Sequence, residues 1–178
     1  AKGLSKQKAP PPPPPPPQRG PSWWEKLSPE RKLDVVGTIM AVVGVLILLV
    51  LVSAQRSGVT ESLIGILRQT FGWGIYVLPL GLIGMGLWLV LRRIEKIPPL
   101  TLERAAGIVI LYLWLLTTMH CIIAAPEMAD QAAMDGAGGG YIGAAFEKFL
   151  FTYLGTGGVV IALLAWLLIA VSMILDRP

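Results

Sequence analysis

The feature that most constrains this chain is a run of 27 residues without a charge, from Phe149 to Leu175. A helix needs about 20 apolar residues to cross the hydrocarbon core of a bilayer, so this run is long enough to span a membrane. Only 15% of all residues are charged, whereas soluble domains carry about 25%. The mean hydropathy is +0.66. The sequence therefore predicts an integral membrane protein and excludes a soluble one.

Four apolar runs predict four transmembrane helices, over about residues 33–54, 71–91, 105–125 and 155–175. Ser28-Pro29-Glu30 is typical of a helix start, because serine is a favoured N-cap and proline suits the first helical position. Pro79 is expected to kink the second helix, since it removes one backbone hydrogen bond. Residues 126–140 are expected to form an acidic, glycine-rich loop.

Two shorter segments, 61–70 and 144–154, are amphipathic and are predicted to lie on the outer membrane surface. Each leads through glycines into a following span, which indicates a weak internal repeat of two similarly oriented hairpins. The predicted fold class is thus an all-α integral membrane protein with four transmembrane helices and two amphipathic outer-surface helices.

The distribution of positive charge predicts the orientation. Twelve of the 15 lysines and arginines lie in the N-terminal tail, the second-to-third connection and the C-terminus, and the other 3 lie in the remaining connections. Because cytoplasmic loops are enriched in these residues, both termini are predicted to be cytoplasmic. The residues next to the spans that carry this argument are Arg31, Lys32, Arg92, Arg93, Lys96 and Arg104.

The basic tail, residues 1–27, contains eight consecutive prolines from Pro10 to Pro17. Proline fixes its own φ and has no N–H, so this stretch favours an extended polyproline II spacer. A second interpretation is a ligand for an SH3-like groove.

The sequence contains little that could do chemistry. No lysine follows a glycine, so no P-loop exists in this chain and we do not expect an enzyme. His120, the single histidine, precedes the single cysteine, Cys121. Two interpretations are open: a ligand to a metal or pigment shared with another subunit, or a polar pair that ends the third span. No cofactor or metal is predicted, and the absence of ionisable residues in mid-span argues against a proton-coupled transporter.

Small residues are the remaining feature. Gly37 and Ala41 are four residues apart, so a neighbouring helix can approach them closely. Gly138 to Gly140 form either an anion-binding backbone loop or a flexible turn. The residues expected to serve helix packing or to mark motifs are Gly37, Ala41, Gly72, Tyr76, Pro79, Gly81, Gly84, Gly139, Gly140, Gly143, Gly155 and Gly158.

Three groups of residues follow one another along the chain: Ser28-Pro29-Glu30-Arg31 leading to Asp34 and Gly37, then Phe71-Gly72 followed by Tyr76-Val77-Leu78-Pro79-Leu80, and finally Gly139-Gly140-Tyr141-Ile142-Gly143 followed by Leu154-Gly155-Thr156-Gly157-Gly158. In this order they resemble the N-terminal four-span membrane domain of FtsK/SpoIIIE-type bacterial DNA translocases. The resemblance covers roughly residues 28–175.

The resemblance implies a membrane domain followed by a linker and a cytoplasmic hexameric ATPase that pumps double-stranded DNA through the division septum. Residues 28–175 would form the four-span domain and residues 176–178 would begin the linker. The chain would then be either a fragment or a relative without the motor. It would anchor and oligomerise a septal translocase in the bacterial inner membrane.

The implied partners are the lipid bilayer, further copies of the chain and division proteins, with DNA reached only through the absent motor. Two other hypotheses stay open. One is an accessory subunit of an energy-conserving or photosynthetic membrane complex, and the other is a transporter or channel.

Overall fold

The computed structural model describes residues 27–53, 58–92 and 101–175. Within these ranges the chain is helical and has no strand, so the predicted all-helical class is confirmed. The proline-rich tail, Arg93, Lys96 and residues 176–178 lie outside the described residues. The elements are α1 (Pro29–Val52), α2 (Gly58–Phe71), the 3₁₀ turn η1 (Gly72–Tyr76), α3 (Leu78–Leu91), α4 (Leu102–Ile123), the 3₁₀ turn η2 (Pro126–Met128), α5 (Ala129–Met134) and α6 (Gly140–Leu175).

The first and third predicted spans correspond to α1 and α4, and both begin at side-chain caps. The hydroxyl of Ser28 accepts a hydrogen bond from the N–H of Arg31, and Pro29 follows at the first helical position. The hydroxyl of Thr101 accepts in the same way from the N–H of Arg104. A capping hydroxyl satisfies one of the backbone donors that a helix start leaves without an internal partner.

The second span differs from the prediction of one helix that is kinked at Pro79. The chain passes from α2 through η1 and turns by 70° into α3. Pro79 lies in the first turn of α3, where its missing N–H removes no helical hydrogen bond. The helix therefore starts at this proline instead of bending around it. The 14 residues of α3 rise about 21 Å, which is shorter than a hydrocarbon core of about 30 Å.

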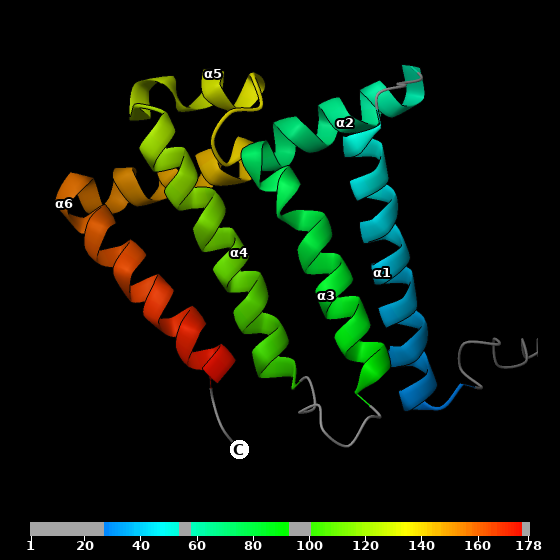
Figure 1. Cartoon of the computed structure of the whole chain (residues 1–178). Coiled ribbons are helices and arrows are strands. Elements are labelled where there is room, and N and C mark those ends of the chain that lie inside the picture. The colour runs from blue at the N-terminus through cyan, green and yellow to red at the C-terminus, as the bar shows by residue number, and fades with distance from the viewer. Residues whose placement is uncertain (1–26, 54–57, 93–100, 176–178) are drawn as a thin grey trace, which may run out of the picture.

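The predicted fourth span follows a sharp bend in α6. Gly155 has φ 63° and ψ 178°, and it divides α6 into a first part (140–154) and a second part (156–175). Figure 1 shows the first part crossing the upper part of α4, below α5, and the second part descending beside α4. The predicted loop over 126–140 is wrong in part, because η2 and α5 occupy much of it.

Long helices pack in two pairs, α1 with α3 and α4 with the second part of α6 (Figure 1). We call these the first and second hairpins. In the first, a Cβ at Gly86 would lie 2.5 Å from the carbonyl oxygen of Gly37 and 2.6 Å from the backbone nitrogen of Ala41. In the second, Trp114 donates a 2.8 Å hydrogen bond to the carbonyl of Leu163. Small residues and an interhelical hydrogen bond are the usual contacts between helices in lipid.

Three of the described helices, α1, α4 and α6, are long and apolar enough to cross a membrane, and the bent pair of α2–η1 with α3 is a fourth candidate. In Figure 1 the start of α1, the end of α3, the start of α4 and the end of α6 all lie on one side. α2, α5 and the first part of α6 lie on the other side, which we call the α2 side.

Candidate functional site

Two glycine-rich segments that are far apart in sequence meet on the α2 side. We call this contact the glycine junction and define it by Gly72, Gly74, Gly138, Gly139 and Gly140. The N–H of Trp73 donates a 2.7 Å hydrogen bond to the carbonyl of Gly138. The junction therefore joins the turn that precedes α3 to the loop that precedes α6.

Only glycine fits at the centre of this contact. Gly72 has φ 57° and Gly140 has φ 61°, a backbone region that side chains disfavour. A Cβ at Gly72 would lie 2.1 Å from the carbonyl oxygen of Gly138. A Cβ at Gly140 would lie 2.5 Å from the carbonyl oxygen of Gln69. The two backbones thus touch at distances that exclude any side chain.

The junction rests on α4. A Cβ at Gly139 would lie 2.0 Å from the carbonyl oxygen of Leu116, and one at Gly74 would lie 2.1 Å from the Leu116 side chain. Leu116 is fully buried. The hydroxyl of Tyr112, one turn earlier, donates a 3.1 Å hydrogen bond to the carbonyl of Gly74. One face of α4 therefore contacts both glycine segments.

His120 lies on the same face of α4 and is fully buried. Its Nδ1 accepts a 3.2 Å hydrogen bond from the N–H of Gly139, and its Nε2 lies 3.0 Å from the carbonyl of Ala129. Because Nδ1 accepts, the ring proton is assigned to Nε2, which donates to Ala129. His120 thus fastens the glycine loop and the start of α5 to the end of α4.

This arrangement favours a structural role for His120 at the end of the third predicted span over a role as a metal or pigment ligand. Both ring nitrogens are engaged by backbone groups, so a metal or pigment would have to displace one of these hydrogen bonds. The described residues contain no group of three or more histidine, cysteine or acidic side chains that could hold a metal ion. The hypothesis of an accessory subunit of an energy-conserving or photosynthetic complex therefore loses His120 as its candidate ligand.

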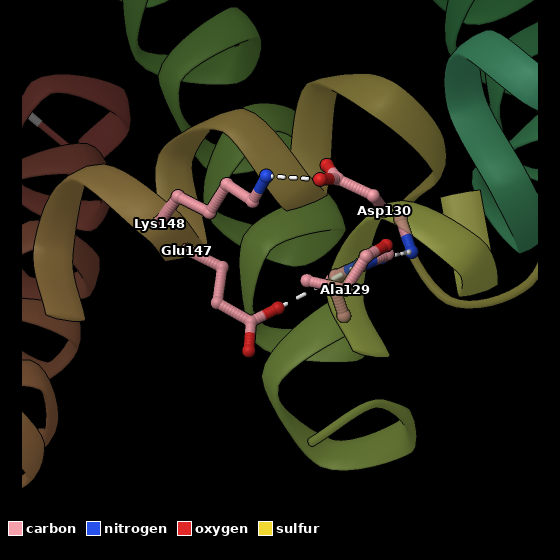
Figure 2. Close-up of polar contacts among 6 residues, drawn as sticks. Ala129, Asp130, Glu147 and Lys148 are labelled. Atoms are coloured by element: carbon pink, nitrogen blue, oxygen red, sulfur yellow. Dashed lines mark hydrogen bonds and ion pairs between the residues drawn. The ribbon is translucent and has the colours of Figure 1, made fainter. Parts of the chain in front are cut away.

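Glu147, in the first part of α6, is fully buried beside His120. Its Oε2 lies 3.7 Å from His120 Nε2, and neither carboxyl oxygen has a hydrogen-bond partner among the described residues. Glu147 precedes the predicted fourth span (155–175), and burial raises the pKa of its carboxyl to about 7. Figure 2 shows the neighbouring Lys148 reaching Asp130 of α5, with which it forms an ion pair.

Glu147 and Leu116 were not among the residues predicted from the sequence. A signal for Glu147 existed, because it follows Gly140, Gly143 and Ala144 at helical spacing and all of these are buried. Small residues on one face of a helix indicate a packed interface, and acidic residues are rarely buried. A glutamate on that face is therefore a candidate buried carboxyl. Leu116 carried no such signal, since one leucine within an apolar helix resembles any other.

Predicted motif residues gather in two places. Gly72, Gly139 and Gly140 lie in the glycine junction, and a Cβ at Gly143 would meet the Leu116 carbonyl oxygen at 2.7 Å. Gly37 and Ala41 face Gly86 in the first hairpin. Pro79 also lies there, since a Cβ at Gly44 would come within 2.8 Å of its carbonyl oxygen.

The other predicted motif residues lie apart from these contacts. Gly81, Gly84 and Gly155 have no atom within 4 Å of an added Cβ. Gly81 lines an apolar cavity of about 460 Å³ between the two hairpins. Gly158 faces Leu154 of its own helix, and Tyr76 is exposed.

Of the predicted topology residues, Arg92 lies 3.6 Å from the Asp34 carboxylate and donates to the carbonyl of Glu30, which fastens the end of α3 to the start of α1. Arg31 and Lys32 lie in the first turn of α1, and Arg104 lies in the first turn of α4. All four residues lie at the end opposite the α2 side.

Comparison with known proteins identifies a family. A family model described as the 4TM region of DNA translocase FtsK/SpoIIIE matches residues 62–178. The matched part begins inside α2 and contains the whole glycine junction, His120 and Glu147. The resemblance noted in the sequence over 28–61 lies outside the matched residues. No curated protein and no solved structure matches the chain.

Proposed function

The chain belongs to the FtsK/SpoIIIE family of DNA translocases, whose four-transmembrane region it contains, and on this premise we propose that it anchors such a translocase at the division septum. The matched region is the membrane part of the family and not its motor. The observation that carries the proposal is the match itself, which covers the second to fourth candidate spans and the contacts that join them.

We further propose four spans with both termini in the cytoplasm, within the bacterial inner membrane. Charge supports this orientation. Arg31, Arg92 and Arg104 lie at the end opposite the α2 side, whereas Arg68 and Lys148 are the lysines and arginines described on the α2 side. Positive residues concentrate in the cytoplasm, so the α2 side would face outward. The domain would extend over residues 28–175, between a cytoplasmic tail (1–27) and the start of a linker (176–178).

The glycine junction suits an anchor. The first and second hairpins contact each other mainly through α2 and η1, which pack against α4, α5 and α6. Backbone contacts that exclude side chains give little room for sliding, because packed interfaces do not deform continuously. The junction would thus hold the two hairpins as one body while the attached motor pulls on DNA.

Self-association is a second part of the proposal. Gly84 lies on α3 without any atom within 4 Å of an added Cβ, so a helix of another copy has room to approach there. In lipid, close approach at small residues is a main source of helix association. Division proteins are further proposed partners, and DNA would be reached only through the motor.

Septal localisation tests the proposed function. We expect the full protein, fused to a fluorescent protein in dividing bacteria, to concentrate at the septum relative to the lateral membrane. A fusion carrying Gly72→Ala should lose this enrichment, because the substitution breaks the glycine junction, whereas Gly157→Ala, which has no atom within 4 Å of its Cβ, should keep it. A uniform membrane signal from the unchanged protein would contradict the proposal.

A further inference from the structure

The apolar cavity of about 460 Å³ between the two hairpins, which we call the hairpin cavity, is lined by α3 and α4, with Met40 contributed by α1. None of the described residues that line it is charged. Two lining side chains carry an O–H or N–H group, and both donate to backbone carbonyls, Tyr112 to Gly74 and Trp114 to Leu163. The cavity therefore presents no unpaired side-chain donor, and an apolar cavity of this kind does not hold water.

The hairpin cavity lies at the depth of the hydrocarbon core. Its lining extends from Leu78 to Met85 on α3 and from Ile108 to Leu115 on α4, which is about two turns or about 11 Å on each helix. The α4 segment lies in the middle of a helix of 22 residues that is long enough to span a bilayer. The cavity is partly open to its surroundings. At this depth the surrounding medium is lipid hydrocarbon.

The size of the cavity decides between a helix and a lipid as its occupant. A helix is about 10 Å across, so a piece about 11 Å long fills roughly 900 Å³, about twice the space present. A dry cavity of about 150 Å³ takes up one benzene molecule, so by proportion the hairpin cavity holds about 18 carbon atoms. We propose that the acyl chains of one bound phospholipid fill the hairpin cavity and pack between α3 and α4.

Packing in lipid gives the reason why such a chain would stay bound. Gly81 lines the cavity with no atom within 4 Å of an added Cβ, and Val109 on the opposite helix is 49% exposed. An empty cavity would leave these surfaces without dispersion partners on one side. Closing the gap would bring no hydrophobic gain, because acyl chains are as apolar as the side chains. The proposal requires only that the chain lies in a bilayer, and it does not depend on the septal role.

Native mass spectrometry tests the proposal on the full protein, extracted into mild detergent from membranes of phosphatidylethanolamine and phosphatidylglycerol and then washed. We expect one phospholipid to stay bound per chain. Gly81→Phe should lose this lipid, because the ring would occupy the cavity. Leu80→Phe places the same ring one residue earlier, at an exposed position that does not line the cavity, and should retain the lipid. Equal retention by the two variants, or no lipid on the unchanged protein, would overturn the proposal.

A second measurement decides the matter even if Gly81→Phe does not fold. Phosphatidylethanolamine with a diazirine on one acyl chain is added to the membranes, and the washed protein is irradiated and digested. We expect adducts on Met85 and Ile108, which line the cavity from different helices. Adducts confined to outward positions such as Ile161 would contradict the proposal. Crosslinking between copies through Met85→Cys, combined with Cys121→Ser, would also overturn it, because it would place a second copy in the cavity.

Discussion

Replacing Gly72 with alanine is expected to lower the free energy of unfolding by about 3 kcal/mol or more. The new Cβ would lie 2.1 Å from the carbonyl oxygen of Gly138 and 2.5 Å from the backbone nitrogen of Gly140, so no side chain can move aside to relieve the overlap. The positive φ of 57° adds strain that alanine cannot avoid. The hydrogen bond from Trp73 to Gly138 should break when the two segments separate.

Thermal unfolding of the purified protein, followed by intrinsic fluorescence, measures this effect. Gly157→Ala is the matched control, because it makes the same chemical change in a helix where no atom lies within 4 Å of the new Cβ. Alanine favours a helix over glycine by about 1 kcal/mol, so the control should keep or raise the midpoint. Equal midpoints for both variants would show that the glycine junction does not support the fold.

Replacing Gly86 with valine is expected to separate α1 from α3 and to lower the unfolding free energy by about 3 kcal/mol. A Cβ there would lie 2.5 Å from the carbonyl oxygen of Gly37 and 2.6 Å from the backbone nitrogen of Ala41, and valine adds two methyl groups beyond it. The α1 backbone would have to move away along much of the first hairpin. The same unfolding measurement applies.

Gly84→Val is the control on the same helix, two residues away, with no atom within 4 Å of its Cβ. Its midpoint should match that of the unchanged protein. If α3 also mediates self-association, Gly84→Val should reduce chemical crosslinking between copies in membranes while it leaves the fold intact. Unchanged crosslinking would remove Gly84 from the proposed interface, and a midpoint as low as that of Gly86→Val would contradict the packing of α3.

Much of the fold could be predicted because its causes are local. The starts of α1 and α4 depend on Ser28 and Thr101, which cap the helices that follow them. The bend at Gly155 was indicated by glycines between an amphipathic and an apolar segment. These features depend on residues within one or two turns, which hydropathy and capping patterns can detect.

The break before α3 and the helix α5 were not predicted, because both depend on contacts between residues far apart in the sequence. The break before α3 lies within an apolar stretch, and its position is fixed where Trp73 bonds to Gly138, far along the chain. α5 is short and rich in alanine, and it folds where Ala129 and Ala133 pack with Ala144 of α6. Periodicity within one segment cannot reveal either partner.

For the candidate site, the sequence indicated the glycine groups one by one but not their meeting. Gly72 and Gly140 belong to different halves of the weak repeat, and only the packing of both against α4 brings them together. His120 was weighed as a ligand or a polar cap because its backbone partners, Gly139 and Ala129, follow it in the next connection. Burial of Glu147 depends on α5, which was expected to be a loop.

The central claim is that the glycine junction lies on the outer face of a four-span domain whose ends are cytoplasmic. The most direct test uses single cysteines at two exposed positions, Glu127→Cys on η2 and Glu103→Cys at the start of α4, each combined with Cys121→Ser. In intact spheroplasts, a membrane-impermeant maleimide should label Glu127→Cys, and it should label Glu103→Cys only after the membrane is opened. Labelling of Glu103→Cys in intact spheroplasts, with Glu127→Cys protected, would contradict the orientation and the outward position of the junction.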